Sequence, residues 1–180
     1  MKRTARIAWS GLMGALAGAC LLLTVFPFAT YALPALASVF LMPVVIECGS
    51  RWATALYTAE ALLALLLTPD IEAKLLFVAF FGYYPIIKSL AERTPIRSLE
   101  WAAKLLVFNG AVIVAYAVLF ALGFSLDVFR IDGVTLPLWG FLLIFLLAGN
   151  VVFVLYDVAL TRLLPLYFSR FQPLFRRLFR

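Results

Sequence analysis

Residues 7–26, IAWSGLMGALAGACLLLTVF, are twenty consecutive residues without a charged side chain. A helix needs about 20 apolar residues to cross the hydrocarbon core of a bilayer. Lys2, Arg3 and Arg6 precede the segment and Pro27 closes it. A signal peptide also starts with basic residues, but its apolar stretch is only about 7–15 residues long. We therefore expect residues 7–26 to be a retained first membrane span.

Further apolar segments follow, and together they predict an all-α, polytopic membrane protein with six transmembrane helices. The expected spans are residues 7–26, 35–48, 52–67, 72–90, 101–124 and 137–160, followed by a basic interfacial tail at 161–180. Apolar residues make up 66% of the chain and the mean hydropathy is +1.07. A soluble domain of that composition would expose an apolar surface. We expect residues 1–180 to form a single transmembrane domain.

The basic residues divide unequally between the two sides of this arrangement. Of the 15 Lys and Arg residues, only Lys74 and Arg130 fall on one side, which leaves 13 on the other. Lys and Arg concentrate in the cytoplasmic loops of membrane proteins. We therefore expect a multi-pass protein of the cell membrane with both termini in the cytoplasm. The basic tail suits anionic lipids of the cytoplasmic leaflet, not nucleic acid.

The residue content excludes several kinds of active site. The chain has no histidine, which rules out His-based metal sites and a Ser-His-Asp centre. It has no P-loop sequence that would hold ATP. The two cysteines, Cys20 and Cys48, are far apart and imply no disulfide framework. We expect neither an enzyme nor a bound cofactor or metal.

Small side chains recur every fourth residue along two neighbouring rows of the first span. The rows are Ser10, Gly14 and Gly18, and Gly11, Ala15 and Ala19. Such rows let two helix backbones approach closely in lipid. The partner is either another span of this chain or a helix of a separate protein. The rows lie near the cytoplasmic surface, which slightly favours a separate protein.

Glu60 lies in the middle of the third expected span, where a charge costs at least about 2.5–3.5 kcal/mol. At 1.5 Å per helical residue, Glu60, Asn109 and Asn150 all lie roughly 10–15 Å from the cytoplasmic boundary. We expect them to form one polar cluster. That cluster is either a hydrogen-bonded packing network or the floor of a ligand cavity.

Tyr83 and Tyr84 precede Pro85 near the middle of the fourth span. A proline at this depth frees backbone carbonyls and bends the helix, which is tolerated beside a cavity or where neighbours satisfy the carbonyls. Tyr116 and Trp139 are placed to add aromatic rings to the outer half of the same cavity.

Other charged residues are expected to neutralise one another near the cytoplasmic ends of the spans. Glu100 with Lys104, and Lys88 with Glu92, have the i,i+4 spacing of ion pairs on one helix. Asp157 is expected to pair with Arg162 or Lys104.

The architecture and the small-residue face resemble the substrate-binding S components of energy-coupling factor (ECF) transporters. In that family the first helix docks through small residues onto a transmembrane coupling subunit, a role matched here by Ser10, Gly11, Gly14, Ala15 and Gly18. The resemblance implies an importer subunit that binds a vitamin-like small molecule and is energised by separate cytoplasmic ATPases. It implies a cavity open to the outside, capped by residues 26–34 and 125–136. The candidate binding residues are Glu60, Tyr83, Tyr84, Asn109, Tyr116, Trp139 and Asn150.

Two other interpretations remain open. Bacterial rod-shape proteins of the MreD type are similar in size, hydropathy and span number, and they imply a non-transporting scaffold of the cell envelope. A secondary transporter with a proton site at Glu60 is the third, although no inverted repeat is visible. A solvated cavity in the outer half distinguishes a transporter from a scaffold.

Overall fold

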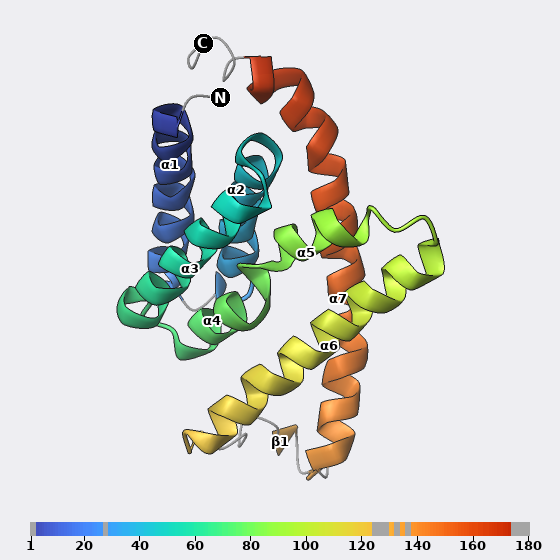
Figure 1. Ribbon diagram of the computed structural model, residues 1–180. Coiled ribbons are helices and arrows are strands. Elements are labelled where there is room, and N and C mark those ends of the chain that lie inside the picture. Colours follow the sequence, from blue (N-terminus) through green and yellow to red (C-terminus); the bar gives the residue numbers. More distant parts are fainter. Residues whose placement is uncertain (1–2, 27–28, 124–129, 132–133, 136–137, 174–180) are drawn as a thin grey trace.

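The computed structural model describes residues 3–26, 29–123, 130–131, 134–135 and 138–173 (Figure 1). Within these residues the chain forms six helical segments and one short hairpin. The segments are α1 (Arg3–Leu22) with a 3₁₀ turn (Leu23–Val25); α2 (Ala32–Cys48); α3 (Ser50–Leu67); α4 (Ile71–Leu76), a π turn (Phe77–Phe81) and α5 (Tyr84–Ala91); α6 (Arg97–Ala121); and α7 (Leu138–Leu166) with a π turn (Tyr167–Phe171). The hairpin pairs β1 (Arg130–Ile131) with β2 (Val134–Thr135).

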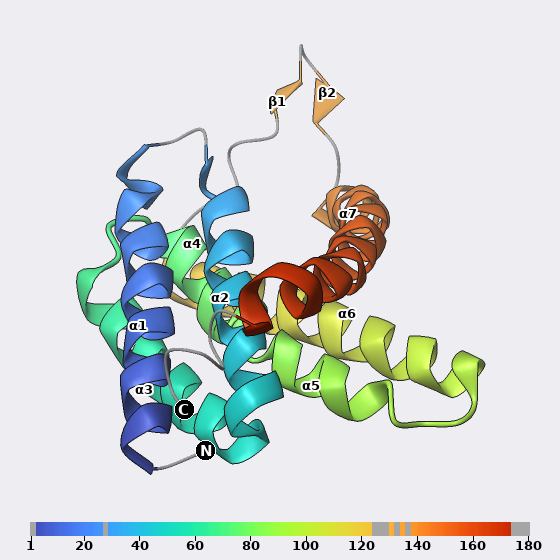
Figure 2. The same cartoon turned by 90° about the horizontal axis from the view of Figure 1, so that it is seen from above.

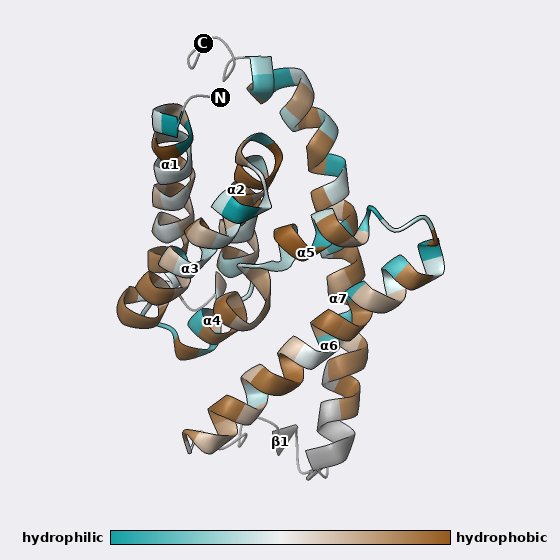
Figure 3. Ribbon diagram, viewed as in Figure 1, coloured by the Kyte–Doolittle hydropathy of each residue, from teal (hydrophilic) through white to brown (hydrophobic). Residues whose placement is uncertain are grey.

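The helical fold class predicted from the sequence is confirmed, with this hairpin as an addition inside the longest predicted loop. Among the described residues, four segments are long and apolar enough to cross a membrane: Arg3–Val25, Ile71–Ala91, Arg97–Ala121 and Leu146–Phe171. α2 is a shorter apolar helix, and α3, which carries Arg51 and Glu60, is not among the four. Hydrophobic residues cover most of α6 and α7 (Figure 3).

The helices form two groups that meet at the fourth segment. α1 packs on α2 and α3, and α6 packs on the fourth segment and on α7. Seen from above, α1 and α3 lie on one side and α7 on the other, with α2 between them (Figure 2). The start of α1 and the end of α7 lie at the same end of the molecule (Figure 1). α7 is the most exposed candidate span, with 17% of its most apolar window buried.

The turn between α2 and α3 consists of one residue, Gly49. Its φ of +90° lies in a region that residues with a Cβ rarely adopt. The Gly49 N–H still bonds to the Val45 carbonyl, one of the acceptors that the end of a helix would otherwise leave unpaired. This tight turn lets α2 and α3, which follow each other in the sequence, pack against each other.

The fourth segment is interrupted before Pro85, at the position where the sequence predicts a bend. In the π turn the Gly82 N–H bonds to Phe77 O at 2.8 Å, which leaves the Val78 carbonyl without its usual helical donor. The Tyr57 hydroxyl of α3 donates to that carbonyl at 2.7 Å. Gly82 is needed there, since a Cβ would lie 2.6 Å from the Tyr57 ring. A neighbouring helix therefore satisfies the interruption.

α7 extends further than expected at its C-terminal end. The predicted span ends at residue 160 and the predicted tail begins at 161, whereas the helix continues to Leu166 and its π turn to Phe171. Pro165 lies within the helix, and the π turn begins two residues later. The first part of the tail is thus an extension of α7.

Aromatic rings fill the space between the fourth segment, α6 and α7. Phe108 and Phe153 stack with ring centroids 4.7 Å apart, and Phe80 meets Phe108 edge-on at 5.2 Å. The buried residues of this core are Met42, Phe80, Tyr84, Phe108, Ala111, Val112, Phe153 and Leu160.

Candidate functional site

A buried ionic network joins α5, α6 and α7. Lys88 of α5 contacts Asp157 Oδ1 at 2.5 Å, and Lys104 of α6 contacts Asp157 Oδ2 at 3.2 Å. Lys88, Lys104 and Asp157 are only 1%, 1% and 3% exposed. The Tyr84 hydroxyl also donates to Asp157 Oδ1, at 2.5 Å. One carboxylate of α7 therefore connects both neighbouring helices.

Two further acids complete the network on its more exposed side. Glu92 lies 2.7 Å from Lys88 and 3.4 Å from Lys104, and Glu100 lies 2.7 Å from Lys104. The two expected i,i+4 pairs are thus confirmed, and Lys104 is confirmed as a partner of Asp157. Arg162, the alternative partner, is exposed and forms no ion pair within the described residues. Lys88, a partner that the sequence analysis did not assign to Asp157, makes the shorter contact.

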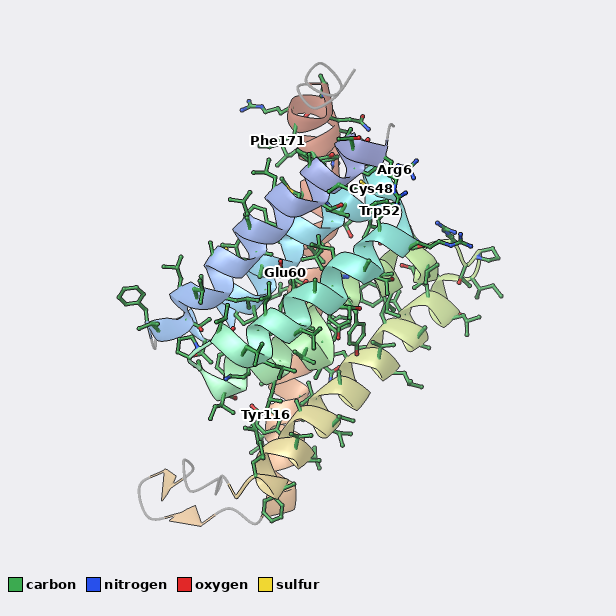
Figure 4. The ribbon with its side chains drawn as sticks, turned by 60° about the vertical axis from the view of Figure 1, so that its left-hand side comes forward. Arg6, Cys48, Trp52, Glu60, Tyr116 and Phe171 are labelled. Atoms are coloured by element: carbon green, nitrogen blue, oxygen red, sulfur yellow. The ribbon has the colours of Figure 1, made fainter. Side chains whose placement is uncertain are left out.

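Of the three polar residues expected to cluster, the structure brings two together. Asn109 of α6 and Asn150 of α7 exchange side-chain hydrogen bonds of 3.0 and 2.9 Å. Each amide nitrogen also donates to the carbonyl one turn earlier in its own helix. Glu60 lies elsewhere, between α1 and α3 (Figure 4). The Asn pair has the form of the packing network considered for the cluster.

The four predicted aromatic binding residues are spread over different parts of the fold. Tyr84 belongs to the ionic network, and Tyr83 packs edge-on against Tyr57 with centroids 5.8 Å apart. Tyr116, labelled in Figure 4, lies twelve residues beyond Lys104 on α6, roughly 18 Å from that part of the network along the helix. The side chain of Trp139 is outside the described part of the molecule.

A second polar cluster joins Tyr116 to the start of α2 and α4. The hydroxyls of Tyr31 and Tyr116 both donate to Glu72 Oε1, at 2.8 and 2.7 Å. Burial and the adjacent Glu72 carboxylate raise the pKa of Tyr31, which precedes α2, to about 12. Asp70 accepts from Thr30 at 2.7 Å and caps α4 through the Ala73 N–H. This group, named the Glu72 cluster, fixes the residues before α2 onto α4.

A half-open pocket of about 300 Å³ lies near this cluster, beside the packed aromatic rings of α6, α7 and the fourth segment, and is called the aromatic cavity below. Its wall is almost entirely apolar, and the lining residues are Tyr31, Leu76, Phe80, Phe81, Phe108, Val112, Ala148, Gly149, Val152, Phe153 and Tyr156. Both lining hydroxyls have partners, since Tyr31 donates to Glu72 and Tyr156 pairs with Ser38. The cavity therefore offers ring faces and aliphatic groups to an occupant.

None of the predicted binding residues whose side chains are described lines this cavity. Phe108 and Gly149, which do, are the sequence neighbours of Asn109 and Asn150. A Cβ on Gly149 would lie 3.3 Å from Phe108 Cζ, so the glycine leaves room for that ring. The sequence signal that would have found the cavity is the set of phenylalanines flanking the polar residues, not the polar residues themselves.

The two rows of small residues on α1 have different environments. Gly14 is packed against Leu56 and Glu60 of α3, so that row is used within the chain. Gly11, Ala15 and Ala19 are exposed, and a Cβ on Gly11 would meet nothing within 4 Å. Of the five residues predicted to bind a partner, Ser10 and Gly14 are buried, Gly18 is half-buried, and Gly11 and Ala15 are exposed. The exposed row is the one free to meet another protein.

No described group of three or more Cys, Asp or Glu residues is arranged to hold a metal ion. In comparisons with known proteins, no family model, curated protein or solved structure matches the chain.

Proposed function

We propose that this chain is a membrane subunit that binds a small, largely apolar solute, in the manner of the substrate-binding subunit of an ECF-type importer. The observation that carries the proposal is the aromatic cavity of about 300 Å³. Ligand pockets usually occupy about 300–1,000 Å³ and are lined mainly by hydrophobic and aromatic side chains. The vitamin-like solute implied by the resemblance would be one with an aromatic or aliphatic body.

Six membrane spans and cytoplasmic termini belong to the same proposal. The 13-to-2 distribution of Lys and Arg supports this orientation. The Glu72 cluster, which includes Tyr31, then lies toward the outside, where a solute enters. Release to the cytoplasm is driven by separate ATPases, and the chain catalyses no reaction itself.

The exposed row Gly11, Ala15 and Ala19 is the proposed contact with a transmembrane coupling subunit. Small side chains allow close approach of helix backbones in lipid, where helices have no hydrophobic driving force to associate. The other row already packs on α3.

Anionic lipids are the third proposed partner. A groove of about 320 Å³ lies between α1, α2 and the end of α7, with Trp9, Met13 and Phe171 in its wall. Arg170 adjoins Phe171 at the same end. The apolar groove would hold an acyl chain, and Arg170 would attract the anionic headgroup of the same lipid.

A scaffold of the cell envelope is the second candidate, favoured by a specific observation. The side-chain amides of Asn109 and Asn150 are bonded to each other, and the Tyr84 hydroxyl is bonded to Asp157. Polar groups that would orient a vitamin are therefore already occupied. A scaffold needs no such groups.

Affinity purification from the native membrane in mild detergent, with mass spectrometry of proteins and small molecules, separates the two functions. The importer predicts co-purified ATPases and a coupling subunit that are lost on Ala15→Leu. Ala55→Leu, at an exposed position of α3, serves as the matched control. Recovery of cell-envelope proteins without ATPases would replace the importer with the scaffold.

A further inference from the structure

In the described part of the chain, two acidic side chains are buried within helices, and their surroundings are opposite. Asp157, 3% exposed, has two lysines and a tyrosine as partners. Glu60, 5% exposed, forms no salt bridge within the described residues, and its Oε2 has no hydrogen-bond partner there. The ionic network thus compensates one buried acid completely and the other not at all.

Glu60 lies in the contact between α1 and α3. We call this contact the seam; its residues are Gly14 and Gly18 of α1 and Leu56 and Glu60 of α3. A Cβ on Gly14 would lie 2.7 Å from Glu60 Oε1, and a Cβ on Gly18 would lie 3.3 Å from Oε2. The two glycines therefore make the space that the carboxyl group occupies. Figure 4 places Glu60 between these two helices, midway along both.

The titratable groups of the elements packed on α3 provide no counter-charge. They are Arg3, Arg6 and Cys20 of α1, Glu47 and Cys48 of α2, Glu72 and Lys74 of α4, and Tyr84 and Lys88 of α5. No hydrogen bond or ion pair joins any of them to Glu60. On α3 itself, the Tyr57 hydroxyl is committed to the Val78 carbonyl, and Arg51 is nine residues away, roughly 14 Å along the helix.

An ionised carboxylate in such a place is unstable. Burial of a charge away from water is costly unless the charge is paired, and a carboxyl group escapes the cost by taking up a proton. We infer that Glu60 is a proton-binding site whose occupancy is coupled to contact between α1 and α3. The carboxylate gains one proton and becomes a neutral acid when the seam closes. It releases that proton only where water reaches the carboxyl group.

This inference is independent of the proposed function, because it requires neither a solute nor a partner protein. Protonation of Glu60 favours the packed seam between α1 and α3, and ionisation disfavours it. Helix association in lipid depends on packing and hydrogen bonds, without a hydrophobic driving force, so the charge of one buried acid affects this contact.

Infrared spectroscopy of the full chain in lipid bilayers tests the inference directly, because a protonated carboxyl group has a C=O stretching band that a carboxylate lacks. At neutral pH the wild-type protein should show this band, Glu60→Gln should lack it, and the ion-paired control Glu92→Gln should retain it. Identical bands in wild type and Glu60→Gln at neutral pH would overturn the inference, since Glu60 would then be ionised.

A pair of glycine variants tests the coupling to the seam and does not depend on the folding of Glu60→Gln. Gly14→Ala brings a Cβ into the space of the carboxyl group, whereas Gly11→Ala brings one into open space. Gly14→Ala should move the disappearance of the band toward the pH at which exposed glutamates ionise, about 4.3, and Gly11→Ala should leave it unchanged. Equal titrations in Gly14→Ala and wild type would refute the coupling.

Discussion

At the scale of single residues, Asp157 is important for stability, because its carboxylate neutralises two buried ammonium groups. Asp157→Asn leaves Lys88 and Lys104 buried with less compensating charge, which should destabilise the protein by about 3–5 kcal/mol. Thermal unfolding in detergent measures the loss. Glu92→Gln, at the more exposed edge of the same network, should cost much less.

The same network gives a double-variant test. Replacing Lys88 by Met together with Asp157→Asn removes a buried charge of each sign, so the pair should cost less than the sum of the two single changes. Additive losses would mean that the two side chains act independently, contrary to the 2.5 Å contact between them.

At the scale of elements, the contact between α6 and α7 depends on few groups, of which the Asn109–Asn150 pair is the most specific. Asn109→Leu leaves the side-chain oxygen of Asn150 without its donor, and hydrogen bonds between membrane helices contribute about 0.6–1.7 kcal/mol. We expect Asn109→Leu to cost about 1 kcal/mol, and the double replacement of Asn109 and Asn150 by Leu to recover part of it. A double-mutant cycle of unfolding free energies provides the measurement.

Element contacts also mark the limit of what the sequence predicts. Segment positions follow from the lengths of apolar runs, and i,i+4 pairs follow from spacing on one helix. Glu60, Asn109 and Asn150 were assigned to one depth, but depth does not determine the direction in which a helix faces. Rotation about the helix axis directs Glu60 toward α1 and the two asparagines toward each other. Apart from the Lys104–Asp157 pair, contacts between helices therefore needed the structure.

At the scale of the whole molecule, the unequal distribution of Lys and Arg between the two sides can be corrected for buried residues. Lys88 and Lys104 count among the 13 basic residues on the expected cytoplasmic side, yet both are buried and paired with acids. Subtracting these two from 13 leaves 11 basic residues for orientation, against two on the other side. The bias survives, so the expected orientation does not depend on the network.

Cysteine labelling tests this topology. Cysteines introduced at Thr94 between α5 and α6, and at the exposed Pro69 between α3 and α4, lie on opposite sides of a six-span arrangement. In a background without Cys20 and Cys48, we expect a membrane-impermeant maleimide added to intact cells to label Pro69→Cys and not Thr94→Cys. Labelling of both cysteines, or of Thr94→Cys alone, would contradict six spans with cytoplasmic termini.

The central claim, that the aromatic cavity binds a solute, is tested most directly by native mass spectrometry of the purified protein and two neighbouring variants. Val151 and Val152 are both 63% exposed, but only Val152 lines the cavity. Val152→Trp should obstruct the open side of the cavity and abolish the mass of a retained small molecule, while Val151→Trp should retain it. The absence of a bound molecule from all three proteins, or its equal retention in both variants, would contradict the account.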